Sequence, residues 1–162
     1  MSIVVPATCV PLTREQPRLE RAVKAIATRG LLECLIVSPR AKQREVLSRA
    51  ATASGWASVV CSDADTARHL AQRIVVKLAF IDLEQGSLDA LVGLQDLASD
   101  LSRMGCPLLV VCGTDGDTQQ EIWARQLGAW LYLPGIAGVE AMTQLCEEAR
   151  TVIERSKSQV GR

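Results

Sequence analysis

The chain has 162 residues, of which 48% are hydrophobic and 22% are charged, and 18 Lys and Arg residues balance 18 Asp and Glu residues. This length and composition predict one globular domain with a modest extension. No apolar run approaches the roughly 18 residues that cross a bilayer, and the five aromatic residues are not interleaved with a basic stripe, so membrane spans and nucleic-acid binding are excluded.

The first 32 residues are predicted to form an N-terminal extension with one accessory helix. The apolar start, Met1 to Pro11, has no early basic residue and no small-residue cleavage site, so we expect no secretory signal and a cytoplasmic protein. A helix is predicted from about Arg14 to Thr28, followed by Gly30 after its end. Its apolar face consists of Leu19, Ala22, Val23 and Ile26.

Five short apolar runs, each bounded by turn or helix-start residues, follow the extension. They are Cys34 to Val37, Ser58 to Cys61, Leu78 to Ile81, Leu108 to Cys112, and Trp130 to Leu133. Because segments with helical periodicity alternate with them, they predict βαβ units around a parallel sheet. Their near-continuous apolar character is typical of strands that are covered on both faces.

The intervening segments each place apolar residues at helical spacing, which predicts helices packed on the sheet. The last of these helices has its apolar stripe at Met142, Leu145, Cys146, Ala149 and Val152. Right-handed crossovers would wind residues 33–155 into an α/β, flavodoxin-like, doubly wound sheet of five parallel strands with helices on both faces. Residues 156–162 are polar, and we expect a flexible tail there.

Helix starts are marked by capping residues. Ser38 before Pro39 predicts a cap followed by a residue preset for the first helical position, and Asp117 with Gln120 resembles a capping box. Ser62 and Ser87 are further candidates for caps.

The order and spacing of these segments resemble the receiver domain of response regulators. The resemblance begins with CLIVSPRAKQREVLSRAATASGWASVVCSDADTARHLAQ, continues with KLAFIDLEQGS, and ends with PLLVVCGTDGD followed by QLGAWLYLPG. It covers about three quarters of the chain.

This resemblance implies that Asp82 stands at the position of the phosphoryl acceptor, at the carboxyl end of the third strand. Receivers hold magnesium with a pair of acidic residues directly after the first strand, but Ser38 and Pro39 occupy those positions here. The carbonyl of Glu84 would be the family-like third ligand. Because magnesium needs oxygen ligands and usually one or two carboxylates, we expect no magnesium unless phosphorylation is retained.

Two further positions lack the residues that receivers use to hold the phosphoryl group. Cys112 replaces the hydroxyl residue at the end of the fourth strand, and Leu133 or Gly135 replaces the lysine at the end of the fifth. Asp115 and Asp117 would lie on the same rim and are weak candidates for a rearranged metal site. A turn and a helix cap explain these two aspartates equally well.

Three aromatic residues are candidates for an interface. Trp130 and Tyr132 occupy alternate positions of the predicted fifth strand and should point to one face, and Trp123 lies on the preceding helix. Receivers use this face for dimers and partners, and Trp and Tyr are enriched in interface cores. Ordinary packing between helix and sheet is the alternative.

No enzyme is predicted. The single histidine, His69, has no nucleophile or metal ligand at a matched spacing, and the six cysteines form no paired motif, so we expect buried free thiols. The sequence favours a bacterial signalling module that binds another signalling protein or a second copy of itself, with phosphorylation lost. Two alternatives remain: a divergent response regulator phosphorylated on Asp82 by a histidine kinase, and a small-molecule or redox sensor that uses the rim cleft or Cys112.

Overall fold

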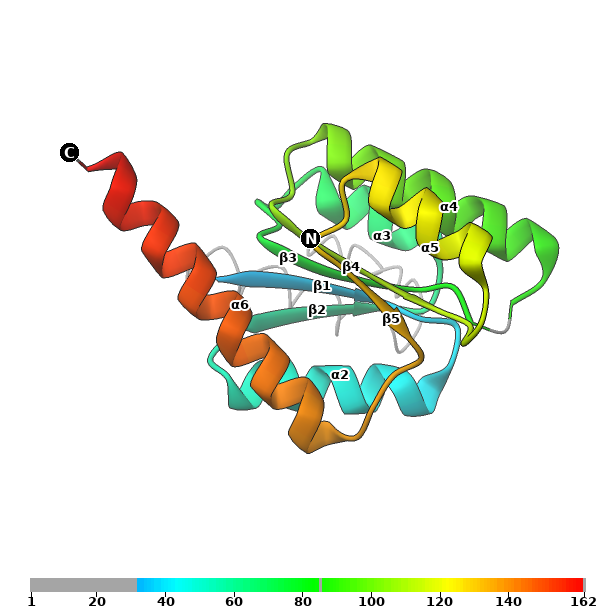
Figure 1. The fold of residues 1–162 in the computed structure, drawn as a ribbon, viewed down its shortest axis with the longest axis horizontal. Helices are drawn as coiled ribbons and strands as arrows, with labels where there is room; N and C mark the ends of the chain where they lie inside the picture. Colours follow the sequence, from blue (N-terminus) through cyan, green and yellow to red (C-terminus); the bar gives the residue numbers. More distant parts are fainter. Residues whose placement is uncertain (1–31, 85, 162) are drawn as a thin grey trace, which may run out of the picture.

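A computed structural model describes residues 32–84 and 86–161 of the protein. The predicted N-terminal helix at 14–28 lies outside the described residues. The described part is a three-layer arrangement in which one sheet lies between two layers of helices (Figure 1).

Strands and helices alternate along the whole described chain, as predicted. The elements are β1 (Glu33–Val37), α2 (Ala41–Ala53), β2 (Ala57–Cys61), α3 (Ala64–Ala71), β3 (Leu78–Asp82), α4 (Leu88–Arg103), β4 (Leu108–Gly113), α5 (Thr118–Leu127), β5 (Leu131–Pro134) and α6 (Val139–Val160). All strand pairs are parallel, in the order β2-β1-β3-β4-β5. The predicted flavodoxin-like α/β fold is therefore confirmed.

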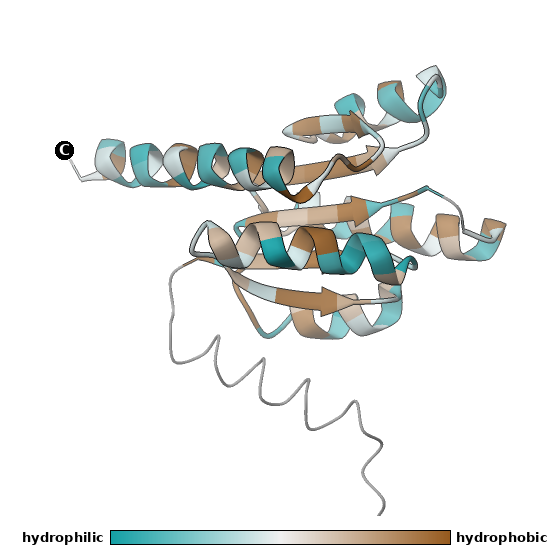
Figure 2. Ribbon diagram, turned by 90° about the horizontal axis from the view of Figure 1, so that it is seen from below, coloured by the Kyte–Doolittle hydropathy of each residue, from teal (hydrophilic) through white to brown (hydrophobic). Residues whose placement is uncertain are grey.

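The sheet separates two hydrophobic cores. Alternate residues of the strands pack against α3, α4 and α5 on one face, and the residues between them pack against α2 and α6 on the other. Figure 2 shows why the strands are buried on both sides: they are hydrophobic along most of their length, whereas each helix mixes hydrophobic and hydrophilic residues.

The strand order also determines where polar side chains can gather. β2 lies on one side of β1, and β3 and the later strands lie on the other side, so the order in which strands are added to the sheet reverses between β1 and β3. The two connections diverge at the carboxyl ends of these strands, where open α/β sheets place their sites.

Of the four predicted helix caps, two are confirmed and two, Ser38 and Ser62, are wrong. Ser87 accepts a hydrogen bond from the backbone N–H of Ala90, and Asp117 accepts one from Gln120. The cap of α3 is Asp63 rather than Ser62, because the Asp63 side chain reaches the backbone N–H of Thr66. A carboxylate suits this place because the start of a helix is electropositive.

Helix α6 differs from its prediction at its end and in its buried face. It continues to Val160, so most of the segment predicted as a tail from residue 156 is helical. Its core residues are Met142, Cys146, Ala149 and Ile153, whereas Leu145 is only half-buried and Val152 is exposed. None of the helices in the described ranges has the length and apolar character that a membrane span requires.

Candidate functional site

Asp82 is the last residue of β3, and its side chain is fully buried. It lies between the end of β1 and Cys112 of β4, which is its partner in the strand register. A buried carboxylate is costly unless charged or hydrogen-bonding groups compensate it. The surroundings of Asp82 therefore determine what this rim of the sheet can do.

Arg40 provides the compensating charge. Its Nη2 atom donates to both carboxylate oxygens of Asp82, at 2.9 Å from Oδ2 and 3.1 Å from Oδ1, and its Nε atom donates to Oδ2 at 3.1 Å. Nη2 also lies 2.9 Å from Oε2 of Glu84. The flat guanidinium group matches a carboxylate in this fork geometry. Arg40 thus places its positive charge directly against the carboxylate of Asp82.

Local backbone geometry aims Arg40 at the rim. The residue is the N-cap of α2 and is extended, with φ −96° and ψ 115°, so its side chain leaves the helix axis at the carboxyl end of β1. Sequence analysis did not identify Arg40. Arg40 follows the first strand by three residues, but no local pattern links it to the buried Asp at the end of the adjacent strand.

Ser38 belongs to the same network, and its predicted role as a helix cap is wrong. Its hydroxyl donates to Oδ2 of Asp82 at 2.6 Å and accepts from the backbone N–H of Arg40 at 3.1 Å. Helix α2 begins only at Ala41, and no side chain caps it. The hydroxyl proton of Ser38 forms a charge-assisted hydrogen bond with the buried carboxylate of Asp82, and this bond orients the side chain toward Asp82.

Glu84 closes the network from the other side. Its backbone N–H donates to Oδ1 of Asp82 at 3.1 Å, and its half-buried side chain accepts from Arg40. Each oxygen of Asp82 therefore has at least two donors, and no lone carboxylate oxygen faces the solvent.

Comparison with solved structures gives close matches to this fold. A response regulator receiver domain protein from Clostridium thermocellum superposes with a TM-score of 0.63 at 14% identity, covering 80% of this chain and 99% of its own. Chemotaxis protein CheY4 of Vibrio cholerae gives 0.61 at 13% identity and covers 74% and 98%. The receiver domain of NtrX from Brucella abortus gives 0.59 at 18% identity and covers 72% and 96%.

The chain has the fold of a response-regulator receiver domain. No family model matches its sequence, and no curated protein matches it either. Receiver architecture is thus retained at a level of sequence identity that shows the fold alone.

A magnesium site of the receiver kind does not fit the residues at this rim. The described residues contain no group of three His, Cys, Asp or Glu side chains that could hold a metal ion. Asp82 and Glu84 are the nearby carboxylates, and both are bound by Arg40. Of the weaker candidates, Asp117 caps α5 and Asp115 is exposed. Magnesium requires a nearly octahedral set of oxygen ligands, and a guanidinium group already occupies this space.

Neither Cys112 of β4 nor the residues at the end of β5 bring a charged side chain to this edge of the sheet. Cys112 is fully buried, and burial, reinforced by the neighbouring Asp82 charge, raises the pKa of its thiol well above the usual range. The thiol is therefore protonated at neutral pH and is a weak hydrogen-bond donor. Leu133 and Gly135, at the end of β5, are half-buried and uncharged.

The predicted aromatic face is divided by the sheet. Tyr132 and Trp123 pack against the core beneath α3, α4 and α5, whereas Trp130 packs against the core beneath α2 and α6. The prediction that Trp130 and Tyr132 share a face is wrong because β5 begins at Leu131, so strand alternation does not include Trp130.

Tyr132 points inward over Gly113. Its hydroxyl lies 3.1 Å from Oε1 of Gln120 and 3.3 Å from the carbonyl oxygen of Thr114. A Cβ atom at Gly113 would collide with the side chains of Tyr132 and Gln120, so glycine is required there. Gln120 therefore bonds Tyr132 and the N–H of Thr114 instead of completing the predicted capping box with Asp117.

Proposed function

We propose that this protein is a receiver-like signalling module that works by binding another protein and that does not accept a phosphoryl group on Asp82. The observation that carries the proposal is the closed network of Arg40, Ser38 and Asp82. The receiver fold supports a role in signalling, and the network argues against the chemistry with which receivers signal.

Phosphorylation of Asp82 would require a free carboxylate oxygen and a cation that also contacts the incoming phosphoryl group. Arg40 and Ser38 direct four donor contacts at the two oxygens of Asp82. An attacking oxygen would have to leave these contacts inside a fully buried site. Breaking a buried ion pair costs roughly 3–5 kcal/mol, and this cost adds to the chemical barrier.

The product would also lack support. Hydrogen bonds to charged groups contribute about 1.5–3 kcal/mol each. By the resemblance to receivers, Cys112 stands where a hydroxyl would supply such a bond and Leu133 or Gly135 where a lysine would, and none of the three carries a charge. We therefore propose no catalytic residue and no resident cofactor, and we expect a protein partner or a second copy in the cytoplasm.

Incubation with a small phosphodonor and magnesium, followed by intact mass measurement, tests the proposal. The wild-type chain should keep its mass, while a receiver domain of established activity, treated in parallel, gains one phosphoryl group. Asp82→Asn provides the matched control for the acceptor position. If the wild-type chain gains one phosphoryl mass and Asp82→Asn does not, the alternative of a divergent, phosphorylated response regulator is correct.

A further inference from the structure

Helix α6 carries a second apolar stripe that does not face the core. Ala141, Leu145 and Val152 follow one another at helical spacing, and all three are exposed or half-buried. The core stripe of Met142, Cys146, Ala149 and Ile153 lies beside it. Sequence periodicity merges the two stripes, and only burial separates them.

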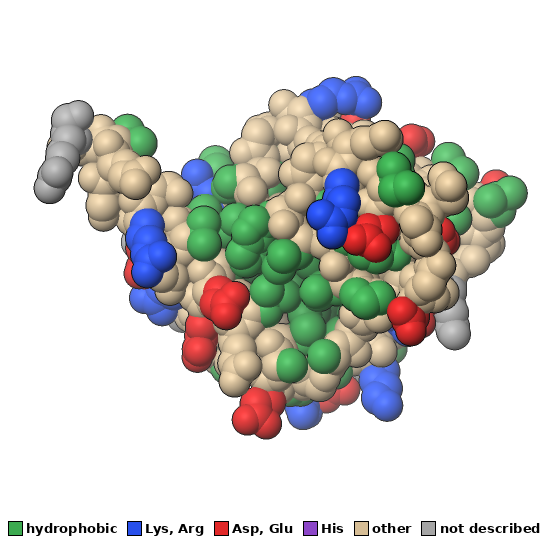
Figure 3. All heavy atoms as spheres, in the orientation of Figure 1, with side chains coloured by type: hydrophobic (Ala, Val, Ile, Leu, Met, Phe, Trp, Pro, Cys, Tyr) green, Lys and Arg blue, Asp and Glu red, His purple; other side chains and the backbone are tan. Residues whose placement is uncertain are grey.

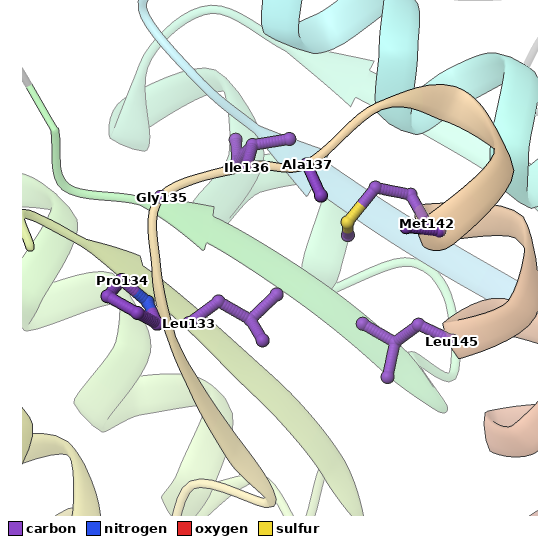
Figure 4. A pocket seen from close by; sticks show the side chains of 8 residues that line it. Leu133, Pro134, Gly135, Ile136, Ala137, Met142 and Leu145 are labelled. Carbon is purple, nitrogen blue, oxygen red and sulfur yellow. The ribbon is translucent and has the colours of Figure 1, made fainter.

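The outward stripe forms one wall of a groove next to β5. The groove has a volume of about 470 Å³ and is lined by Leu133, Pro134, Gly135, Ile136, Ala137, Ala141, Met142 and Leu145. In Figure 4, Leu133 from β5 and Leu145 from α6 point toward one another across it, and Ile136 and Ala137 come from the connecting loop. This space is large enough for several aliphatic side chains.

The groove belongs to a larger apolar surface at the edge of the sheet. β5 is an edge strand among the described strands, and Trp130, Leu131 and Leu133 are only half-buried. Figure 3 shows hydrophobic side chains gathered in the middle of this face, with acidic side chains on the part of α6 next to them and basic side chains farther along that helix toward the C-terminus. An apolar patch with a polar rim is typical of a surface that binds another segment.

The charge along the border of this apolar surface favours a basic occupant. Glu140, Glu147 and Glu148 are exposed on α6, and none of them forms an ion pair within the described residues. Glu148 lies on the outward stripe itself, between Leu145 and Val152. Residues 1–31 contain five Lys and Arg against two Asp and Glu, a net charge of +3, so residues 32–162 carry −3.

We propose that residues 14–28 bind this groove in the same chain as an amphipathic helix. Its apolar face, Leu19, Ala22, Val23 and Ile26, would enter the groove, and Arg18 on the flank of that face would meet the acidic border of α6. The proposal concerns a different surface from Asp82 and holds whether or not that residue accepts phosphate.

The length of the chain permits this contact. β1 begins at the amino edge of the sheet, and four residues, 29–32, join it to the predicted helix. Four extended residues reach about 14 Å, and a helix of 15 residues is about 22 Å long. The groove lies three strand spacings, roughly 14 Å, to the side and about one strand length, roughly 17 Å, toward the carboxyl edge. An oblique helix beside α6 covers this distance.

Hydroxyl-radical footprinting of Leu133, Ile136 and Leu145 in the full chain tests the proposal. Ile26→Asp places a charge in the apolar face of the predicted helix. Burial of one such side chain corresponds to roughly a tenfold or larger change in a binding equilibrium, so oxidation of the three groove residues should rise several-fold. Ala25→Asp adds the same charge outside the apolar face and should leave their oxidation at the wild-type rate.

Sedimentation over a range of protein concentrations completes the test. A monomer whose groove opens only in Ile26→Asp supports docking within one chain. Equal oxidation in all three proteins, or an equal rise in both variants, overturns it. Protection that increases with concentration together with a dimer mass also overturns it, because the occupant would then be a second copy.

Discussion

Replacement of Arg40 by alanine should destabilise the protein by removing the charge that compensates Asp82. The Asp82 side chain has no exposed surface, and that of Arg40 is 22% exposed. Removing one partner of a buried ion pair costs roughly 3–5 kcal/mol. Because Arg40 is not fully buried, water can enter part of the space that it leaves. We therefore expect a loss of about 2–4 kcal/mol in the free energy of unfolding.

Urea denaturation at pH 7 measures this loss, and Arg49→Ala is the matched control. Arg49 lies on the same helix and pairs with Glu45, but both side chains are more than 60% exposed. Such a pair contributes about 0.5 kcal/mol or less. The contrast between the two variants separates the burial of the pair from the general effect of deleting an arginine.

The double variant Arg40→Ala, Asp82→Asn identifies the cause of the loss. Asparagine carries no charge and can still accept from Ser38, so it should restore at least about 1 kcal/mol relative to Arg40→Ala alone. A loss below about 0.5 kcal/mol in Arg40→Ala, or no recovery in the double variant, would refute the reasoning.

Three further predictions concern other parts of the protein. Burial raises the pKa of Glu33 above its usual 4.5. The protonated Glu33 side chain therefore makes its full contribution to stability below pH 4.5, and this contribution is lost as the pH rises through the raised pKa. Urea denaturation should therefore show Glu33→Gln to be more stable than wild type at pH 7, with the difference shrinking below pH 4.5. Trp56→Phe removes the bond from Nε1 to the carbonyl oxygen of Cys146, 2.9 Å long and buried, and should cost about 1–3 kcal/mol in thermal unfolding. In native protein at pH 8, alkylation followed by mass mapping should label Cys106, whose pKa is raised to about 11, faster than the fully buried Cys112. Fast labelling of Cys112 would instead favour the redox-sensor alternative.

The sequence predicted the rim residues more reliably than their contacts. Asp82 ends a strand whose apolar run is visible in the sequence, so its place could be predicted. Ser38 was assigned to a helix cap because capping is a local pattern, whereas its actual acceptor is 44 residues away. Arg40 was not identified because an arginine near a helix start has no local signature for a partner 42 residues along the chain.

Local sequence patterns likewise predicted the fold, whereas the surface features depended on tertiary structure. Alternation of apolar runs with helical periodicity is a short-range property, because strands and helices bury faces of fixed period, and it determined the layers and the parallel sheet. Tertiary structure decided which apolar residues of α6 meet the core, which side of the sheet Trp130 packs on, and which cation neutralises Asp82. These outcomes depend on how crossover connections bring segments that are distant in the sequence into contact, and local periodicity does not show which segments will meet.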